Sequence, residues 1–151
     1  MFELLQAGHN KNAFDCGNDA INHYLSHMAS QHMKKGISQV HVLTDDNQIQ
    51  GFFTLSSISL DNSENLIKGY PKQIPSILIG RLAIDKNQQG KGLSNRLISE
   101  ALYLTKQISL IVGLAFIVID AKNDDLANYY ERLGFYRLPN QLRLLYPVNQ
   151  I

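Results

Sequence analysis

The stretch Ser76-Ile-Leu-Ile-Gly-Arg-Leu-Ala-Ile-Asp85, which runs on into Lys86-Asn-Gln-Gln-Gly-Lys-Gly-Leu-Ser-Asn-Arg96, decides the fold. Its first half is a short apolar run, a length that fits a buried strand better than a helix. Its second half is a glycine-bearing turn that opens into apolar residues at helical spacing. A strand, a glycine turn and a helix N-terminus in this order present free backbone N–H groups and the positive end of a helix dipole. The pattern predicts a site for a phosphorylated ligand at residues 89–94.

The turn lacks the marks of two common phosphate sites. Lys91 is followed by Gly92 and not by the Ser or Thr that a nucleotide P-loop places on magnesium. Asn95 stands where a dinucleotide fingerprint needs its third glycine. The remaining pattern, Gln89-Gly90-Lys91-Gly92-Leu93-Ser94, resembles the Q/R-x-x-G-x-G/A motif with which GCN5-related N-acetyltransferases (GNATs) hold the pyrophosphate of acetyl-CoA. Taken alone, the turn could equally be a simple connection.

A second motif lies at Asp120-Ala-Lys-Asn-Asp-Asp-Leu-Ala-Asn-Tyr-Tyr-Glu-Arg-Leu-Gly-Phe135. Asn123 or Asp124 can cap a helix there, and Gly134 can end it in the left-handed conformation. The part from Tyr129 to Phe135 resembles the last helix of the GNAT family, F/Y-Y-x-x-x-G-F. The two motifs in this order favour the family more strongly than either does alone.

A third motif stands near the N-terminus, at Phe14-Asp-Cys-Gly-Asn-Asp-Ala-Ile-Asn-His-Tyr-Leu25. It is similar to the F-x-C-G-x-x-x-L-x-x-(F/Y)-L motif of the acetyltransferase toxins of bacterial type II toxin–antitoxin modules, with Ile21 at the leucine position. Those toxins acetylate the amino group of aminoacyl-tRNA and stop translation. Cys16 is the only cysteine, and a lone cysteine is more often a small buried hydrophobe than a nucleophile.

The resemblance implies an α+β GNAT fold in a single domain over residues 1–151. One mixed, mostly antiparallel twisted sheet is flanked by helices on both faces, with a splay between the two central strands. Acetyl-CoA is the implied co-substrate, with no metal. Its expected binding residues are Leu82, Ala83, Ile84, Gln89, Gly90, Lys91, Gly92, Leu93, Ser94 and Asn123.

Tyr130 matches the tyrosine acid of the family. A phenol of pKa about 10 is protonated at neutral pH and can protonate a departing thiolate of pKa about 8.5. The alternative for Tyr130 is simple packing in the core. An acceptor α-amine, with a pKa of about 8, keeps a usable neutral fraction without a base, whereas a lysine of pKa about 10.4 needs one. No acidic residue lies within residues 77–84 to serve as that base, which favours an α-amino substrate.

The resemblance also implies partners: aminoacyl-tRNA, a small DNA-binding antitoxin and a second copy of the chain in a homodimer. Lys34, Lys35 and Arg81 are the predicted tRNA contacts, since a formal net charge of +1 over 151 residues requires a local basic patch. Two other functions stay open. One is acetylation of a small amine or of protein or peptide amino groups outside any toxin system. The other is a catalytically idle acetyl-CoA-binding module.

The rest of the sequence suits a cytoplasmic protein without a membrane segment. A single cysteine rules out an internal disulfide and fits a reducing compartment. Polar residues interrupt the opening residues, so no signal segment is expected. The longest apolar stretch, 108–119, is broken by Ser109 and Gly113 and is too short to span a bilayer. His23 and His27 are four apart on a predicted helix, but no third metal ligand accompanies them.

Hydrophobic spacing and turn residues predict the order of the elements. The N-terminal half should hold a lead-in or edge strand at 1–7, a turn at 14–17 and a helix at 18–34 that buries Ile21, Tyr24, Leu25 and Met28. A hairpin of strands 39–44 and 49–59 and a loop at 61–75 should follow. The C-terminal half should hold a strand at 77–84, a helix at 93–112, a strand at 114–120, a helix at 124–133 and closing strands at 135–138 and 142–147.

Overall fold

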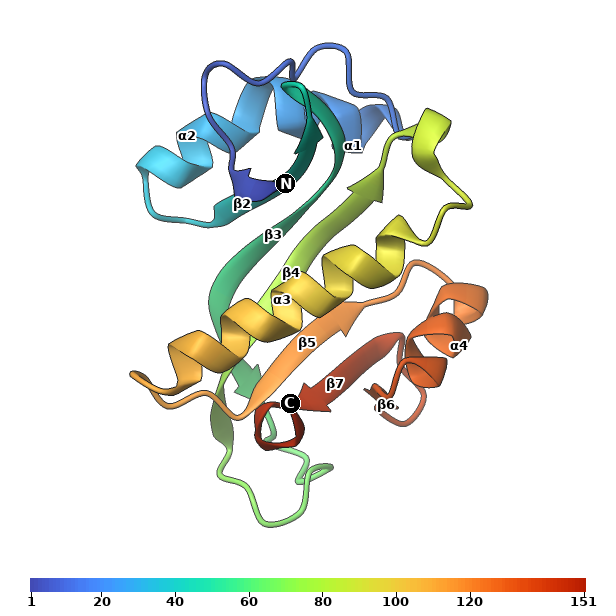
Figure 1. The fold of residues 1–151 in the computed structure, drawn as a ribbon. Helices are drawn as coiled ribbons and strands as arrows, with labels where there is room; N and C mark the ends of the chain where they lie inside the picture. The colour runs from blue at the N-terminus through green and yellow to red at the C-terminus, as the bar shows by residue number, and fades with distance from the viewer. The chain divides into compact units, whose positions relative to one another are not determined.

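The computed structural model describes residues 1–151, and its strands form a seven-stranded sheet in the order β1-β2-β3-β4-β5-β7-β6 (Figure 1). The strands are β1 (Phe2–Leu4), β2 (Gln39–Asp45), β3 (Gln48–Asp61), β4 (Gln73–Ile84), β5 (Phe116–Asp120), β6 (Tyr136–Arg137) and β7 (Arg143–Pro147). β4 and β5 pair in parallel, and the pairs β1–β2, β2–β3, β5–β7 and β6–β7 are antiparallel. The predicted mixed, mostly antiparallel sheet is confirmed.

The helical segments also follow the predicted order. They are α1 (Asp19–His23), the π-helix η1 (Tyr24–Met28), α2 (Ala29–Lys34), the 3₁₀ turn η2 (Lys86–Gln88), α3 (Leu93–Ser109), α4 (Asp124–Arg132) and the 3₁₀ turn η3 (Val148–Gln150). α3 ends before the predicted boundary at residue 112, because the chain leaves the helix in a turn closed by the Ile111 N–H on the Ile108 carbonyl at 2.9 Å. No helix of the structure is both long and apolar enough to cross a membrane.

The chain divides into two compact units. The first consists of Met1–Ser56 and Gly80–Ala101, and the second consists of Ser57–Ile79 and Leu102–Ile151. Each unit buries its own apolar cluster, around Phe52 and Leu25 in the first and around Val118 and Phe116 in the second. The single domain over residues 1–151 stays a prediction.

In the first unit, the predicted helix 18–34 is interrupted by the π-helix η1. Asn18 caps its start, accepting a hydrogen bond from the Ile21 N–H at 3.1 Å. The wider π turn shifts the buried face by one residue, so Ala29 is fully buried where Met28 was predicted, and Met28 is 39% exposed. The prediction for Met28 was therefore wrong, whereas Tyr24 and Leu25 are buried as expected. Ile21 is partly buried against the same core.

The hairpin of the first unit turns at Asp46 and Asn47, which have φ values of 51° and 65°. Positive φ at both central residues defines the turn type that matches strand twist, and Asp and Asn tolerate it. Asp45 pairs directly with Gln48 across this turn. The predicted hairpin is confirmed, with the first strand one residue and the second three residues longer than expected.

In the second unit, β4 begins at Gln73, so the predicted loop 61–75 is too long. Pro75 lies inside the strand, where its nitrogen carries no hydrogen to pair and its carbonyl accepts from the Ala115 N–H at 2.8 Å. The shorter loop is held by the buried Asn62, whose side chain donates to the Ile67 carbonyl and accepts from the Ile67 N–H, both at 2.9 Å.

Candidate active site

The glycine turn predicted to hold a phosphate lies in the first unit, between η2 and the start of α3. Gly90 and Gly92 have φ values of 80° and 77°, a backbone conformation that other L-residues rarely adopt. None of the backbone N–H groups of residues 90–94 donates a hydrogen bond within the chain. A Cβ at either glycine would meet no atom within 4 Å. The turn thus combines open space with unpaired donors at the N-terminus of a 17-residue helix, the arrangement that binds anions.

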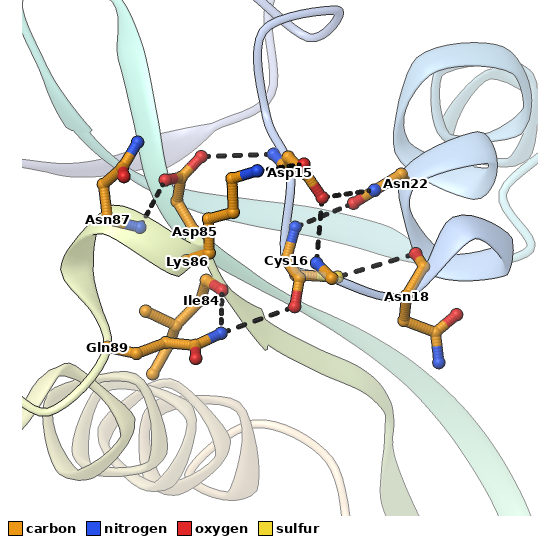
Figure 2. A network of polar contacts seen from close by, with 10 residues as sticks. Asp15, Cys16, Asn18, Asn22, Ile84, Asp85, Lys86, Asn87 and Gln89 are labelled. Atoms are coloured by element: carbon orange, nitrogen blue, oxygen red, sulfur yellow. Dashed lines mark hydrogen bonds and ion pairs between the residues drawn. The ribbon is translucent and has the colours of Figure 1, made fainter.

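The segment before this turn is tied to the N-terminal Phe14–Gly17 motif by a set of polar contacts (Figure 2). The Asp15 N–H donates to the Asp85 carboxylate at 3.1 Å, and the Lys86 N–H donates to the Asp15 carbonyl at 2.8 Å. The Lys86 ammonium lies 3.0 Å from the Asp15 carboxylate. The Gln89 amide donates to the Cys16 carbonyl at 3.4 Å and to the Ile84 carbonyl at 3.1 Å. We call these residues, together with Asn22, the Asp15–Gln89 network.

The carboxylate of Asp15 is the most strongly perturbed group of this network. It accepts from the Gly17 N–H and from the Asn22 amide, both at 2.9 Å. These two donors and the Lys86 ammonium, with the Gly17 N–H the largest influence, lower the pKa of Asp15 to about 2. The Asp15 carboxylate in turn raises the pKa of Lys86, and the nearby Asp85 charge adds to this effect. Asp15 and Lys86 therefore form a fully charged pair at neutral pH.

Cys16, in the same motif, serves the structure through its backbone. Its N–H donates to the Asn22 side chain at 2.9 Å, and its thiol is 3.7 Å from the Asn18 carbonyl. The partly buried side chain packs against the core of the first unit. These contacts agree with the interpretation of Cys16 as a packing residue and place no base beside its sulfur.

The predicted cofactor residues of β4 follow each other at its C-terminal end. Ala83 is buried, and Leu82 and Ile84 are partly exposed. The backbone of this segment lies against β3, where a Cβ at Gly51 would come within 3.1 Å of the Ala83 carbonyl. Gly51 was not singled out by sequence reasoning, although a glycine inside a strand often marks such a close approach.

Tyr130 lies in the second unit, on α4. The side chain packs beside Tyr129 and Phe135, with ring centroids 5.5 Å and 6.0 Å away, and only 7% of the residue is exposed. Its hydroxyl makes no hydrogen bond within the chain, yet no buried side-chain oxygen lacks a partner, so this oxygen must reach solvent. Burial raises the pKa of Tyr130, and the neighbouring Tyr129 raises it further. The phenol is therefore protonated throughout the physiological range.

Asn123, also predicted to contact the cofactor, caps α4. Its side-chain oxygen accepts from the Leu126 N–H at 2.9 Å. The helix is capped at its C-terminal end by Leu133, and the next residue, Gly134, has a φ of 105°. A Cβ on Gly134 would lie 3.1 Å from the Tyr146 ring, so the position excludes a larger residue. The cap and the glycine together fix the part of the chain that carries Tyr130.

The three residues predicted to contact tRNA all lie in the first unit. Lys34 ends α2, Lys35 follows it, and both are exposed. The guanidinium of Arg81 lies over the Tyr24 ring, 3.6 Å from its centroid. Arg81 makes no side-chain hydrogen bond within the chain, so all five N–H groups remain available. Sequence reasoning missed the role of Tyr24 as the surface on which Arg81 rests.

The pair formed by His23, the last residue of α1, and His27 of η1 offers no metal centre. The rings of His23 and His27 stack with centroids 4.4 Å apart, and His27 is bonded to the Ser26 hydroxyl at 2.6 Å. No group of three or more His, Cys, Asp or Glu side chains in the structure is placed to hold a metal ion.

The sequence profile of the acetyltransferase (GNAT) domain matches residues 36–137, a range that includes β4, the glycine turn and α4. The chain belongs to the GNAT family. As a GNAT protein it is an acetyl-CoA-dependent acetyltransferase. The unpaired N–H groups of the glycine turn fit the pyrophosphate of this co-substrate.

Among characterised proteins, this GNAT acetyltransferase is 29% identical over 126 residues to the tRNA-acetylating toxin of Mycobacterium tuberculosis, covering 82% of this chain and 76% of the relative. Its structure is similar to that of AtaT complexed with acetyl-methionyl-tRNAfMet, with a TM-score of 0.88, 29% identity and coverage of 99% of this chain and 95% of that one. It is also similar to a tyrosine-to-phenylalanine mutant of the AtaT toxin bound to the C-terminus of the antitoxin AtaR and acetyl-CoA. That match has a TM-score of 0.85, 29% identity and coverage of 99% and 94%.

Proposed function

We propose that this GNAT acetyltransferase is a toxin that transfers the acetyl group of acetyl-CoA to the α-amine of an aminoacyl-tRNA and so blocks translation. The observation that carries the proposal is the fit of nearly the whole chain to a tRNA-acetylating toxin fold, with 99% of it covered by AtaT in complex with acetylated tRNA. The unpaired donors of the glycine turn and the free hydroxyl of Tyr130 support the same chemistry.

The glycine turn would hold the pyrophosphate of acetyl-CoA through the N–H groups of residues 90–94. Helix N-termini bind phosphate because their first N–H groups lack partners and the helix dipole adds positive potential. In this proposal backbone groups of Leu82 and Ile84 hold the pantetheine in the expected splay beside β4, and one of their N–H groups stabilises the developing oxyanion. Acetyl-CoA itself supplies the acetyl group as a thioester.

Tyr130 is the proposed general acid. A leaving thiolate needs a proton, and the Tyr130 hydroxyl is protonated, unpaired and reaches solvent. Attack by the neutral amine forms the C–N bond and leaves a positive charge and one extra proton on its nitrogen; as the C–S bond breaks, Tyr130 protonates the thiolate, and the proton lost from that nitrogen restores the phenol. An α-amine of pKa about 8 requires no strong protein base, in agreement with the absence of acidic residues from residues 77–84.

Arg81, Lys34 and Lys35 are the proposed contacts to tRNA phosphates. The Arg81 guanidinium rests on the Tyr24 ring, which leaves its edge free to donate in the planar geometry that phosphate accepts. Tyr24 also contacts His32 of α2, with ring centroids 5.4 Å apart, so Arg81 and the end of α2 belong to one packed group. Such a group gives a nearly neutral chain a local basic surface.

The toxin function implies further partners. An AtaT structure contains the C-terminus of an antitoxin, and we infer a small DNA-binding antitoxin for this chain as well. We further infer that the protein forms a homodimer and acts in the cytoplasm, where aminoacyl-tRNA is found.

The decisive experiment measures transfer from labelled acetyl-CoA to purified aminoacyl-tRNA over a salt series, alongside free polyamines and peptides. We expect acetylated tRNA, with transfer falling as salt rises because each phosphate contact releases counterions. The double variant Lys34→Glu/Lys35→Glu should lose tRNA acetylation and keep acetyl-CoA binding. The control Lys68→Glu/Lys72→Glu makes the same change in net charge on the loop before β4 and should keep both. Acetylation of polyamines or peptides without any tRNA product would overturn the proposal in favour of an ordinary amine acetyltransferase.

A further inference from the structure

The Phe14–Gly17 motif contributes no side chain to the proposed chemistry, yet it makes a dense set of contacts with the chain that leads into the glycine turn. Residues 15 and 16 contact residues 85, 86 and 89 through two backbone donors, one ion pair and one side-chain amide. Figure 2 shows the side chains of Lys86 and Gln89 both directed toward this motif. All of these residues lie in the first unit.

We propose that the Asp15–Gln89 network positions the pyrophosphate turn, with Gln89 as the positioning residue that joins the motif to the turn. Gln89 immediately precedes Gly90, and its amide donates to two carbonyls, that of Cys16 in the motif and that of Ile84 at the end of β4. The inference rests on the proposed binding of the pyrophosphate by residues 90–94.

The turn needs such an anchor because little holds it from within: its one local side-chain bond is the 3.4 Å contact of the Lys91 ammonium with Gln88. Gly90 and Gly92 have no side chains, and the N–H groups of residues 90–94 make no hydrogen bonds. A glycine-rich segment with few internal contacts samples many conformations, and binding must then offset the entropy cost of ordering it. Fixing the residue before the turn reduces this cost, because it fixes where the donors point.

The Asp15–Gln89 network fixes the position of the chain before the glycine turn and contributes little to the free energy of unfolding. Its ion pair is exposed, with 60% of the Lys86 side chain and 43% of the Asp15 side chain accessible, and exposed pairs stabilise proteins weakly. The backbone of residue 15, by contrast, is held on both sides: its N–H donates to the Asp85 carboxylate and its carbonyl accepts from the Lys86 N–H. Loss of a network contact should therefore affect ligand affinity more than folding.

This assignment gives the Gln89 side chain a role beside the cofactor contact predicted for the residue. Its amide donates to two backbone carbonyls of the protein. The adjacent Gln88 provides a natural contrast, since its only side-chain bond is a 3.4 Å contact with the exposed Lys91.

The test compares Gln89→Met with the matched control Gln88→Met, which removes the same amide from the neighbouring residue. Acetyl-CoA affinity is measured by calorimetry, together with that for acetyl-pantetheine, which lacks the pyrophosphate. We expect Gln89→Met to weaken acetyl-CoA binding about twofold to tenfold, the range for one hydrogen bond, and to leave acetyl-pantetheine binding and Tm unchanged. KM for acetyl-CoA should rise by the same factor with kcat retained.

Lys86→Met and Lys86→Arg extend the test to the ion pair. Lys86→Met should weaken acetyl-CoA binding in the same selective way, and Lys86→Arg should restore most of it. Equal affinity in Gln89→Met and Gln88→Met, or an equal loss for acetyl-pantetheine, would overturn the positioning role. The variant Gly92→Glu distinguishes a wrong positioning role for Gln89 from a wrong location of the pyrophosphate site. If Gly92→Glu also leaves acetyl-CoA affinity unchanged, the pyrophosphate is bound elsewhere.

Discussion

Two regions of this acetyltransferase carry its proposed chemistry, and they are held in place by different forces. The glycine turn of the first unit follows a partly exposed network of hydrogen bonds and one ion pair, centred on Asp15. Tyr130 of the second unit is held by aromatic packing against the buried Phe135, which in turn contacts the Tyr146 ring. Polar contacts fix a backbone whose own donors must stay free, whereas apolar packing fixes a side chain whose hydroxyl must stay protonated. The first region should govern affinity, and the second should govern the rate of transfer.

The largest effect should come from Tyr130→Phe. The change keeps the ring and its packing but removes the dissociable proton, so folding should persist while kcat falls about 10²- to 10⁴-fold, the range for a lost general acid. Acetyl-CoA affinity should be unchanged. Steady-state kinetics and thermal melting check these expectations. Wild-type turnover in the variant would reduce Tyr130 to a core residue and remove the contrast between the two regions.

The pH dependence of the reaction sharpens the same contrast. Burial raises the pKa of Tyr130, and the active form of an acid is the protonated one, so the phenol should not limit activity below about pH 10. The rise in kcat/KM with pH should instead follow deprotonation of the acceptor α-amine, about tenfold per pH unit below a pKa of about 8. A fall in rate between about pH 7 and 9 would contradict the assignment of Tyr130 as the acid.

Gly92→Glu tests the first region. The glutamate adds bulk and negative charge where the phosphates approach, and the φ of 77° strains any side-chain-bearing residue. Acetyl-CoA affinity should fall at least about tenfold, a loss of about 1.4 kcal/mol, and kcat at saturation should fall much less. The control is Gly69→Glu, because Gly69 has a comparable φ of 84° and open surroundings. It introduces the same backbone strain at a position outside the predicted pyrophosphate site. Equal losses in both variants would show that only strain was measured.

The smallest effect should be the acid dependence of Asp15. Its pKa in the folded chain is about 2, below the ordinary 3.8, so its contribution to stability is present above pH 3.8 and is lost as pH falls toward 2. The difference in Tm between the wild type and Asp15→Asn should be constant near neutral pH and shrink over that acid range. A difference that stays constant down to pH 2 would show that the carboxylate charge does not matter to the network.

The sequence predicted regions of strong local pattern well. The apolar run before Gly90, the spacing of α3 and the cap at Asn123 each depend on neighbours in sequence, and their elements appear where expected. Predictions failed where tertiary contacts decide. The π turn that exposes Met28 and buries Ala29 depends on how the helix packs. The hydrogen bond from the Gln89 side chain to the Cys16 carbonyl joins residues far apart in sequence, so no local pattern could indicate it. The stacking of Arg81 on Tyr24 has no local signature either.

The most direct test of the account is mass spectrometry of aminoacyl-tRNA after incubation with acetyl-CoA and either the wild-type protein or Tyr130→Phe. The tRNA is hydrolysed gently and the released amino acid is examined for an acetyl group on its α-nitrogen. The account predicts N-acetylated amino acid with the wild type and about 10²- to 10⁴-fold less with the variant at equal time. The contradicting result is that every aminoacyl-tRNA tested releases unmodified amino acid, although the same enzyme preparation acetylates other amines with the same acetyl-CoA.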